Sequence, residues 1–347
     1  MQLNGITWNH SRGFTSIVAA AQRFQELNPS VEINWSKRSL QAFADQPINE
    51  LAQQFDLLII DHPWAGFAAK TASIVALDKY LDATFLKDQA NNSVGHSHIS
   101  YAYNEHQWAI AIDAATPVAA SRPDLLDRFQ LKLPKNWEEL VALSKEGYVA
   151  IPGIPQDTLM SFYMLCSTLG EDVCTTDQYV ISAEVGLLAL EHLRELGQYI
   201  NKDCYSMNPI QVYEAMTLTD QYAYSPFAYG YANYARKGFA RKLLQFHDLL
   251  SINDKALITT LGGTGLAISS HCNHMEWAAK FVSFAGSKEI QKGIFFDSGG
   301  QPGHRAAWED SYTNFISGDY FKKTLPALDR AFLRPRYHGH MFFQDHA

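Results

Sequence analysis

The sequence has no run of about 18 apolar residues, so it contains no segment expected to insert into a membrane as a helix. Its four cysteines, Cys166, Cys174, Cys204 and Cys272, form no CxxC and no metal-ligand spacing. Buried free thiols and a bridge between the nearby Cys166 and Cys174 both remain open. The chain carries 28 basic and 36 acidic residues. This net charge of −8 argues against nucleic acid as a partner.

Motifs that mark common enzyme classes are missing as well. No GxSxG, P-loop, HExxH or dinucleotide-binding GxGxxG occurs. The histidine pairs His96 with His98 and His271 with His274 lack the i, i+4 spacing of a helical zinc site. We therefore expect no cofactor, no metal and no enzymatic activity, although catalytic residues need not be neighbours in sequence.

The pattern of apolar residues predicts an α/β chain. Leu3–Trp8 is a predicted strand, a helix follows that ends at Asn28, and Val31–Trp35 alternates like a second strand. This β-α-β order favours a parallel sheet. Phe55–Ile60 is a predicted strand whose last four residues form a continuous apolar run, typical of a strand that is buried on both faces. With 347 residues the chain fits two lobes.

Two segments are predicted to cross between these lobes. The strand Gln107–Asp113 is followed by short side chains around Pro117, which suit an outgoing crossing. The glycines and apolar residues of 261–269 suit a returning one, with a helix over 276–284 and a second glycine cluster at 298–303 after it. The predicted division is therefore 1–113 plus 261–303 for lobe 1, and 114–260 plus 304–347 for lobe 2.

The second lobe is predicted to be rich in helices and tyrosines. A helix over 182–200 places Leu187 and Leu190 near its apolar face. In the aromatic segment 221–234, we expect a strand before Pro226, and Tyr229 and Tyr231 in a loop or early helix after it. Tyrosine offers a stacking face and a hydroxyl, which suit a polyhydroxylated ligand. A purely structural aromatic cluster is the alternative.

Polar and aromatic side chains follow two predicted strands of the first lobe at their carboxyl ends, where ligands bind in open α/β sheets. An indole there can stack on a sugar ring, while acids and imidazoles bond hydroxyls. The alternative is a pair of ordinary loops whose tryptophans pack inward. The candidates after the first strand are Trp8, His10 and Arg12, and those after the buried strand are Asp61, His62 and Trp64.

Several motifs together resemble the extracellular solute-binding proteins of sugar-type (family 1) ABC importers, the maltose-binding-protein-like group. They are ITW at 6–8, FQELNPSVEINW at 24–35, FDLLIIDHPWAG at 55–66, WAIAIDAATPVAASRPDLL at 108–126, LPKNWEELVALSK at 133–145, GGTGLAISSHCNHMEWAAKFVSFAGSKEIQKGIFFDSGGQPGHRAAW at 262–308 and RPRYHG at 334–339. The order of these motifs along the chain carries the resemblance. The chain departs from the family in ending soon after RPR, without the usual long helix.

The resemblance implies a two-lobed periplasmic-binding-protein-like fold of type II, with hinge strands and a ligand cleft at the interface. A solute such as a sugar or sugar derivative would be captured by closure of the lobes, and the closed form would meet a membrane permease. Asp113 and Arg12 would be hydrogen-bond anchors, and Trp64 and the tyrosines stacking surfaces. The implied ligand-binding set is Trp8, His10, Arg12, Asp61, His62, Trp64, Asp113, Tyr229, Tyr231, Gly263, Thr264 and Gln301.

Two other functions remain open. Arg12 with His10 and His62 suits a small carboxylate or sulfonate, through charge-assisted hydrogen bonds. The second is a cytoplasmic sensor or enzyme on the same fold, for which Asp61 and Asp113 are the only obvious acid–base pair. The first residues show no signal peptide. The family implies a periplasmic protein whose leader Met1 replaces, whereas a native Met1 implies a cytoplasmic one. We expect a monomer.

Overall fold

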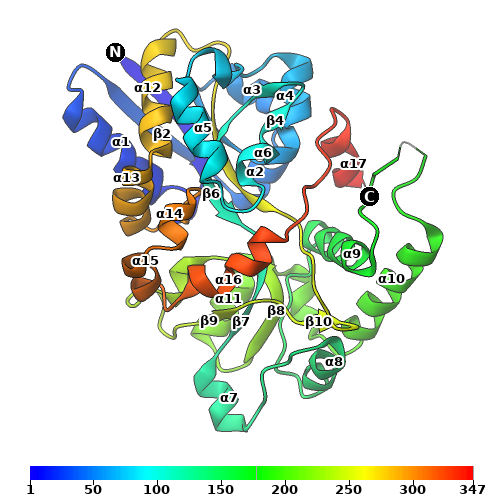
Figure 1. Cartoon of the computed structure of the whole chain (residues 1–347). Coiled ribbons are helices and arrows are strands. Elements are labelled where there is room, and N and C mark those ends of the chain that lie inside the picture. Colours follow the sequence, from blue (N-terminus) through cyan, green and yellow to red (C-terminus); the bar gives the residue numbers. More distant parts are fainter. Residues whose placement is uncertain (177, 347) are drawn as a thin grey trace. The chain divides into compact units, whose positions relative to one another are not determined.

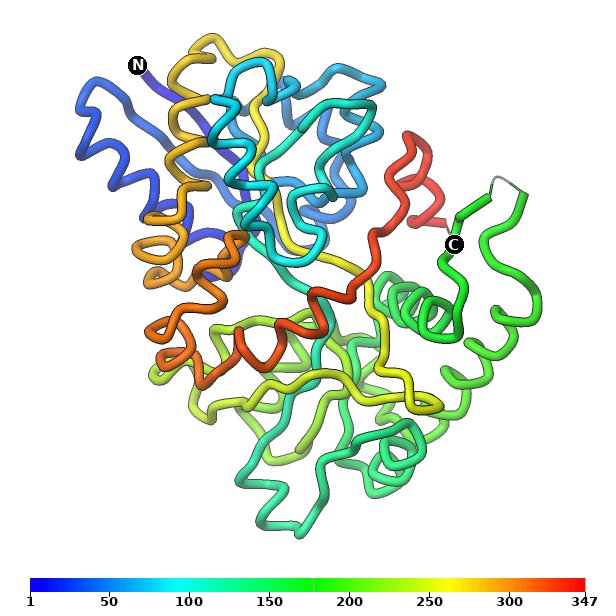
Figure 2. The backbone as a smooth tube through the Cα atoms, in the orientation of Figure 1, coloured from blue at the N-terminus to red at the C-terminus, as the bar shows by residue number. Residues whose placement is uncertain are grey.

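The computed structural model describes residues 1–176 and 178–346, which form two compact units. Unit 1 consists of residues 1–114, 262–313 and 335–346, and unit 2 of residues 115–261 and 314–334. The chain therefore passes between the units at 114/115, 261/262, 313/314 and 334/335. Figure 2 lets the reader follow these passages along the backbone by colour.

Unit 1 is built on a five-stranded sheet. The strand order is β2-β1-β3-β12-β6, in which β1 pairs in parallel with β2 and β3, while β12 runs antiparallel to β3. The returning strand is thus inserted next to the buried one, as Leu266 pairs with Ile59. The strands of unit 1 are β1 (Gln2–Trp8), β2 (Glu32–Arg38), β3 (Leu57–Ile60), β4 (Ala102–Tyr103), β5 (His106–Gln107), β6 (Ile110–Ala115, which ends one residue into unit 2) and β12 (Gly262–Ile268).

Helices cover both faces of this sheet, and the alternation along β3 shows why. Leu57 and Ile59 belong to one apolar core, and Leu58 and Ile60 to the other. All four are at most 1% exposed, so the continuous apolar run is buried on both faces as predicted. The helical segments of unit 1 are α1 (Thr15–Leu27), α2 (Leu40–Asp45), α3 (Ile48–Ala52), η1 (His62–Trp64), α4 (Ala65–Thr71), η2 (Leu77–Lys79), α5 (Ala83–Asn91), α6 (Ser97–Ser100), α12 (Met275–Gly286), α13 (Lys288–Ile290), the π-helical η5 (Gln291–Phe295), α14 (Arg305–Trp308), α15 (Ser311–Ile316, which ends in unit 2) and α17 (His340–His346).

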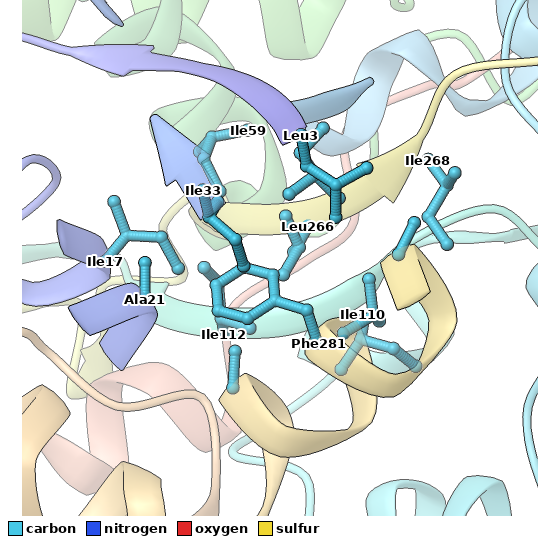
Figure 3. Packing of buried hydrophobic residues seen from close by; sticks show 14 of the residues in the cluster. Leu3, Ile17, Ala21, Ile33, Ile59, Ile110, Ile112, Leu266, Ile268 and Phe281 are labelled. Carbon is cyan, nitrogen blue, oxygen red and sulfur yellow. The ribbon is translucent and has the colours of Figure 1, made fainter. Parts of the chain in front are cut away.

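The larger core lies between the sheet and the pair α1 and α12, which lie side by side in Figure 1. Figure 3 shows Ile17 of α1 and Phe281 of α12 facing strand residues such as Leu266. Ile17, Phe281 and Leu266 have no exposed surface. Burying a side chain of this size fully stabilises the fold by about 1.5–3 kcal/mol, so this core fixes the sheet whose ends carry the candidate residues.

Unit 2 combines a three-stranded antiparallel sheet, in the order β8-β7-β9, with a helical layer. The cap residues Asn136 and Ser182 accept backbone N–H bonds at the starts of α8 and α10. Its elements are β7 (Pro117–Ser121), α7 (Pro123–Phe129), α8 (Trp137–Lys145), α9 (Pro155–Leu169), α10 (Ala183–Gly197), η3 (Lys202–Ser206), α11 (Pro209–Leu218), β8 (Tyr224–Tyr229), η4 (Ala232–Ala235), β9 (Gln245–His247), β10 (Ser251–Ile252), β11 (Lys255–Ala256) and α16 (Tyr320–Asp329).

The prediction that Pro226 ends its strand is wrong, because β8 continues to Tyr229. The pairing with β7 shifts by one residue there: Val118 pairs with Ala228, whereas Ala120 pairs with Ser225. Pro226 therefore lies in a bulge of an edge strand, a position that needs no ladder hydrogen bond from its nitrogen. As a result, Tyr229 lies at a strand end rather than in a loop.

The division into units differs from the predicted one in the C-terminal part. Residues 304–313 and 335–346 belong to unit 1, not to the second lobe. The second of these segments is fixed by Arg336, whose guanidinium donates to the carbonyl oxygens of Ile99 and Ala102. Its backbone also lies directly over Gly66, where any side chain would collide with the Arg336 carbonyl. The segment ends in α17, a helix that the apolar pattern does not predict.

The expected burial of Leu187 and Leu190 is also wrong. They are 60% and 55% exposed, because α10 turns Ala189 and Leu196 toward the interior of unit 2 instead. The apolar residues of α10 occupy more than one face, so periodicity alone does not determine which of them is buried.

All four cysteines are free thiols. Burial raises the pKa of Cys166 to about 12 and that of Cys272 to about 11, so both thiols stay protonated and unreactive in the native protein. We expect a thiol-specific reagent to modify four cysteines in denaturant, and the native protein to react slowly, starting with the half-buried Cys174. Fewer than four thiols in unreduced, denatured protein would contradict this assignment.

Candidate functional site

The turn after β1 holds His10 and Arg12 in a fixed geometry. The backbone N–H groups of Gly13 and Phe14 both donate to the His10 carbonyl oxygen, and the Arg12 N–H donates to His10 Nδ1 at 3.0 Å. Burial, together with the charge of Arg12, lowers the pKa of His10 to about 3. His10 is therefore neutral near pH 7, with its proton on Nε2, and it offers a hydrogen-bond donor rather than a positive charge.

Arg12 and Asp113 form a buried ion pair. Arg12 Nε donates to Asp113 Oδ2 at 2.7 Å, and Nη2 donates to Oδ1. The two side chains are 4% and 1% exposed. Burial raises the pKa of Asp113, while Arg12 and the backbone N–H of Thr264 oppose this rise by bonding the charged form. The pair therefore ties the turn after β1 to the end of β6 and the start of β12.

Gly263 and Gln301 complete this junction. Gln301 Nε2 donates to the Ala114 carbonyl oxygen at 2.8 Å, and the Ala114 N–H donates to the Gln301 carbonyl oxygen at 3.1 Å. Gly263 has φ +98°, and a Cβ at this position would lie 2.3 Å from the Asp113 carbonyl oxygen. Thr264 is 4% exposed. These residues join the strands at the point where the chain leaves and re-enters unit 1.

The two tryptophans of the predicted site pack inward. Trp8 is 3% exposed and contacts Phe43 at 5.3 Å between ring centroids, and Trp64 is 4% exposed and packs edge-on against Phe67. His62 follows Asp61 in the same loop and has no exposed surface. Asp61 retains partial exposure and accepts the His62 backbone N–H at 2.8 Å. The carboxyl-end loops of unit 1 thus present His10 and Asp61 more openly than the tryptophans.

In unit 2, Tyr229 and Tyr231 differ in their accessibility. Tyr231 is 4% exposed and packs against Tyr213. Tyr229 is half-buried, and its hydroxyl lies 2.7 Å from Thr260 Oγ1. Tyr229 lines a small hollow of about 10 Å³, which has room for roughly one water-sized group. Tyr229 is therefore the predicted aromatic residue that borders open space within its own unit.

The same hollow contains a residue that no sequence motif singles out, Asp157. This third residue of α9 is 8% exposed, and burial raises the pKa of its carboxyl to about 7. No hydrogen bond or ion pair of this carboxyl occurs in the described part of the chain. The sequence signal is an acid in the first turn of a helix that follows a buried apolar segment, Val149–Ile151.

Asp157→Asn is expected to stabilise the ligand-free protein above neutral pH. The folded pKa of about 7 lies above the unfolded value of 3.8. The wild type therefore loses stability as the pH rises from about 4 to about 7, whereas the asparagine cannot ionise. We expect a gain of roughly 1–3 kcal/mol in the free energy of unfolding at about pH 8, and no difference at about pH 4, measured by denaturant titration.

Glu184→Gln is the matched control for this prediction. Glu184 also lies in the first turn of a 15-residue helix, α10, but it is exposed. An acid near a helix N-terminus stabilises the helix by about 0.3–1 kcal/mol, so the control should lose stability slightly at neutral pH. If Asp157→Asn behaved like the control, the helix dipole rather than burial would dominate at Asp157.

The bacterial extracellular solute-binding protein family model matches residues 7–292, so the chain belongs to this family. Its members are substrate-binding proteins of transporters, and the chain is accordingly a solute-binding protein. No curated protein sequence gives a significant match.

Solved structures with the same fold include several ligand-bound receptors. Maltose-bound MalE3 of T. maritima has a TM-score of 0.82 at 16% identity, covering 99% of this chain and 92% of that one. A solute-binding protein of Thermotoga lettingae bound to α-D-tagatose has a TM-score of 0.82 at 15% identity, with 99% and 91% covered. UgpB from Mycobacterium tuberculosis in complex with glycerophosphocholine has a TM-score of 0.73 at 17% identity, with 96% and 87% covered. The predicted two-lobed, type II periplasmic-binding-protein fold is thereby confirmed.

No helix within residues 1–176 and 178–346 has the length and apolar character required to cross a bilayer.

Proposed function

We propose that this protein is the substrate-binding protein of an ABC importer that captures a sugar or sugar derivative outside the cytoplasmic membrane and delivers it to a membrane permease. The family match carries the proposal, and the maltose- and tagatose-bound structures of the same fold support the ligand class. In this proposal the ligand contacts both units and favours a closed arrangement through its differential affinity.

The ligand is held by side chains that keep some exposure in this structure. Neutral His10 donates from Nε2, Asp61 accepts from ligand hydroxyls, and Tyr229 supplies a ring face. Arg12, Asp113, Gln301, Gly263 and Thr264 build the junction behind these residues. Trp8, His62, Trp64 and Tyr231 stay in the proposed set as neighbours that a change of arrangement brings to the ligand.

A receptor for a small carboxylate or sulfonate finds less support. Its cationic site would need Arg12 and a charged histidine, but Arg12 is already paired with Asp113 and the low pKa of His10 keeps that ring neutral. An enzyme on this fold would need an acid and a base in the site. Asp61 and Asp113 are the candidates, and Asp113 is held in a buried ion pair. The absence of turnover is therefore part of the proposal and needs a direct measurement.

A thermal-shift screen tests the proposal. Purified full-length protein is heated with mono- and disaccharides, polyols, sugar acids and small carboxylates, and each compound is recovered for mass spectrometry. A ligand that binds the native state raises the Tm as its concentration exceeds its Kd. We expect shifts from saccharides and recovery of unchanged compound. Shifts confined to carboxylates would overturn the sugar class, and chemical conversion of a ligand would overturn the receptor role.

A further inference from the structure

We propose that the hollow of unit 2 is a subsite for a positively charged amine on the ligand, with the Asp157 carboxylate as its counter-ion. The inference rests on the proposed function and narrows its ligand class from sugars in general to solutes that carry a protonated amine, such as amino sugars.

The hollow is built mainly from apolar groups. Met160 and Met164 lie one turn apart on α9, and Phe227 and Tyr229 come from β8. Pro117, the first residue of β7, lines it as well. Tyr229 thus belongs both to the proposed ligand-binding set and to the hollow, which places a charged residue next to a proposed ligand contact.

Asp157 is the one acidic or basic residue that lines the hollow, and it is 8% exposed without a charged partner among residues 1–176 and 178–346. A carboxylate removed from water in apolar surroundings is costly unless a positive group or hydrogen bonds compensate for it. Burial alone already raises its pKa to about 7. A ligand cation would remove this cost, whereas an apolar ligand group would increase it.

The lining favours an amine over a neutral hydroxyl. A sugar hydroxyl both donates and accepts, so its sites usually offer both kinds of partner. The Ser161 hydroxyl already donates to the Asp157 backbone carbonyl oxygen at 2.9 Å, and the Tyr229 hydroxyl lies 2.7 Å from Thr260 Oγ1. The lining residues left for a ligand are an acid that accepts hydrogen bonds, Asp157, together with two aromatic residues and two methionines. Aromatic faces attract cations, and a carboxylate gives an ammonium a charge-assisted hydrogen bond.

The position of Asp157 in the first turn of α9 has a simpler explanation, because an acid there stabilises the helix dipole. That explanation accounts for the residue type but not for its burial beside a hollow that two methionines and a phenylalanine also line. The exposed Glu184 in α10 performs the same helix role without burial.

Binding of matched sugars tests the inference. The probes are glucosamine, N-acetylglucosamine and glucose, their β-1,4-linked dimers, and ethanolamine as a primary amine without a sugar. Affinities are measured by isothermal titration calorimetry on the full chain, with the wild type, Asp157→Asn and the control Glu184→Gln. We expect an amine to bind the wild type about tenfold or more tightly than its N-acetyl counterpart. Asp157→Asn should remove this preference, and Glu184→Gln should keep it.

Every outcome decides one of the two proposals. If neutral sugars bind as well as amines, or if Asp157→Asn keeps the preference for amines, the amine subsite is wrong and the sugar receptor stands. If ethanolamine binds through Asp157 and no sugar of the thermal-shift screen does, the subsite stands and the sugar class is wrong. If no probe binds, the amine subsite is wrong, and the sugar receptor is decided separately by the thermal-shift screen. The comparison of amine with N-acetyl sugar uses the wild type alone, so it does not depend on the folding of a variant.

Discussion

Arg12→Ala is expected to lower the free energy of unfolding by about 3–5 kcal/mol, because it leaves the Asp113 carboxylate buried without its partner. Asp113 is 1% exposed, and Arg12 supplies two of the hydrogen bonds to its oxygens. Denaturant titration followed by circular dichroism measures the loss. Saccharide binding should weaken as well, since the pair positions the turn that carries His10.

The pH dependence of this variant gives a second check. Without Arg12, only the Thr264 backbone N–H still opposes the effect of burial on the Asp113 carboxyl, so its folded pKa rises further above the unfolded value. A group whose pKa is raised on folding contributes stability below its unfolded pKa and loses it as the pH rises through the folded one. The deficit of Arg12→Ala should therefore shrink on acidification.

Arg23→Ala is the matched control for Arg12→Ala. Arg23 also pairs with a carboxylate, Glu26, but both side chains are 48% exposed. Exposed pairs contribute about 0–1 kcal/mol, so the control should stay close to the wild type. Equal losses in the two variants would show that the Arg12–Asp113 pair does not stabilise the junction between β1, β6 and β12.

Gly263→Ala is expected to lower the free energy of unfolding by about 3 kcal/mol or more, and to weaken ligand binding. At φ +98° an alanine is strained, and its Cβ would meet the Asp113 carbonyl oxygen at 2.3 Å and the Ala114 Cα at 2.8 Å. These neighbours are backbone atoms, so they cannot move aside without opening the sheet at the point where the chain changes units. Thermal and denaturant unfolding measure the effect.

Gly339→Ala provides the control for this substitution. Gly339 is exposed, and a Cβ added there would have its nearest neighbours at 3.6 Å and 3.8 Å, both in the side-chain ring of Tyr337. The loss of stability should stay within about 0.5 kcal/mol. A Gly263→Ala variant as stable as Gly339→Ala would contradict the close approach of β12 to Asp113.

Much of the fold was predictable from local patterns. The β1-α1-β2 order, the run Leu57–Ile60 and the return at 262–268 follow from periodicity, apolar runs and glycine placement. The caps Asn136 and Ser182 are local as well, because a side chain bonds a backbone N–H three residues away. These features depend on neighbours in sequence, so the sequence reveals them directly.

The site was less predictable, because its contacts are distant in sequence. Arg12 and Asp113 were both predicted as ligand anchors, but their 101-residue separation hid that they bond each other. Similarly, a tryptophan after a strand can face a ligand or the core, and only the packing partners Phe43 and Phe67 decide the orientation in this structure. The bulge at Pro226 depends on the register with β7, which no single segment encodes.

Small-angle X-ray scattering with and without a bound saccharide tests the central claim most directly. A solute receptor of this fold should bind one ligand and shift toward a closed arrangement, because the ligand gains contacts only there. We predict that the radius of gyration falls when a saccharide that raises the Tm saturates the protein, and that the saccharide is recovered unchanged. Saturating binding with no change in the radius of gyration would contradict the account.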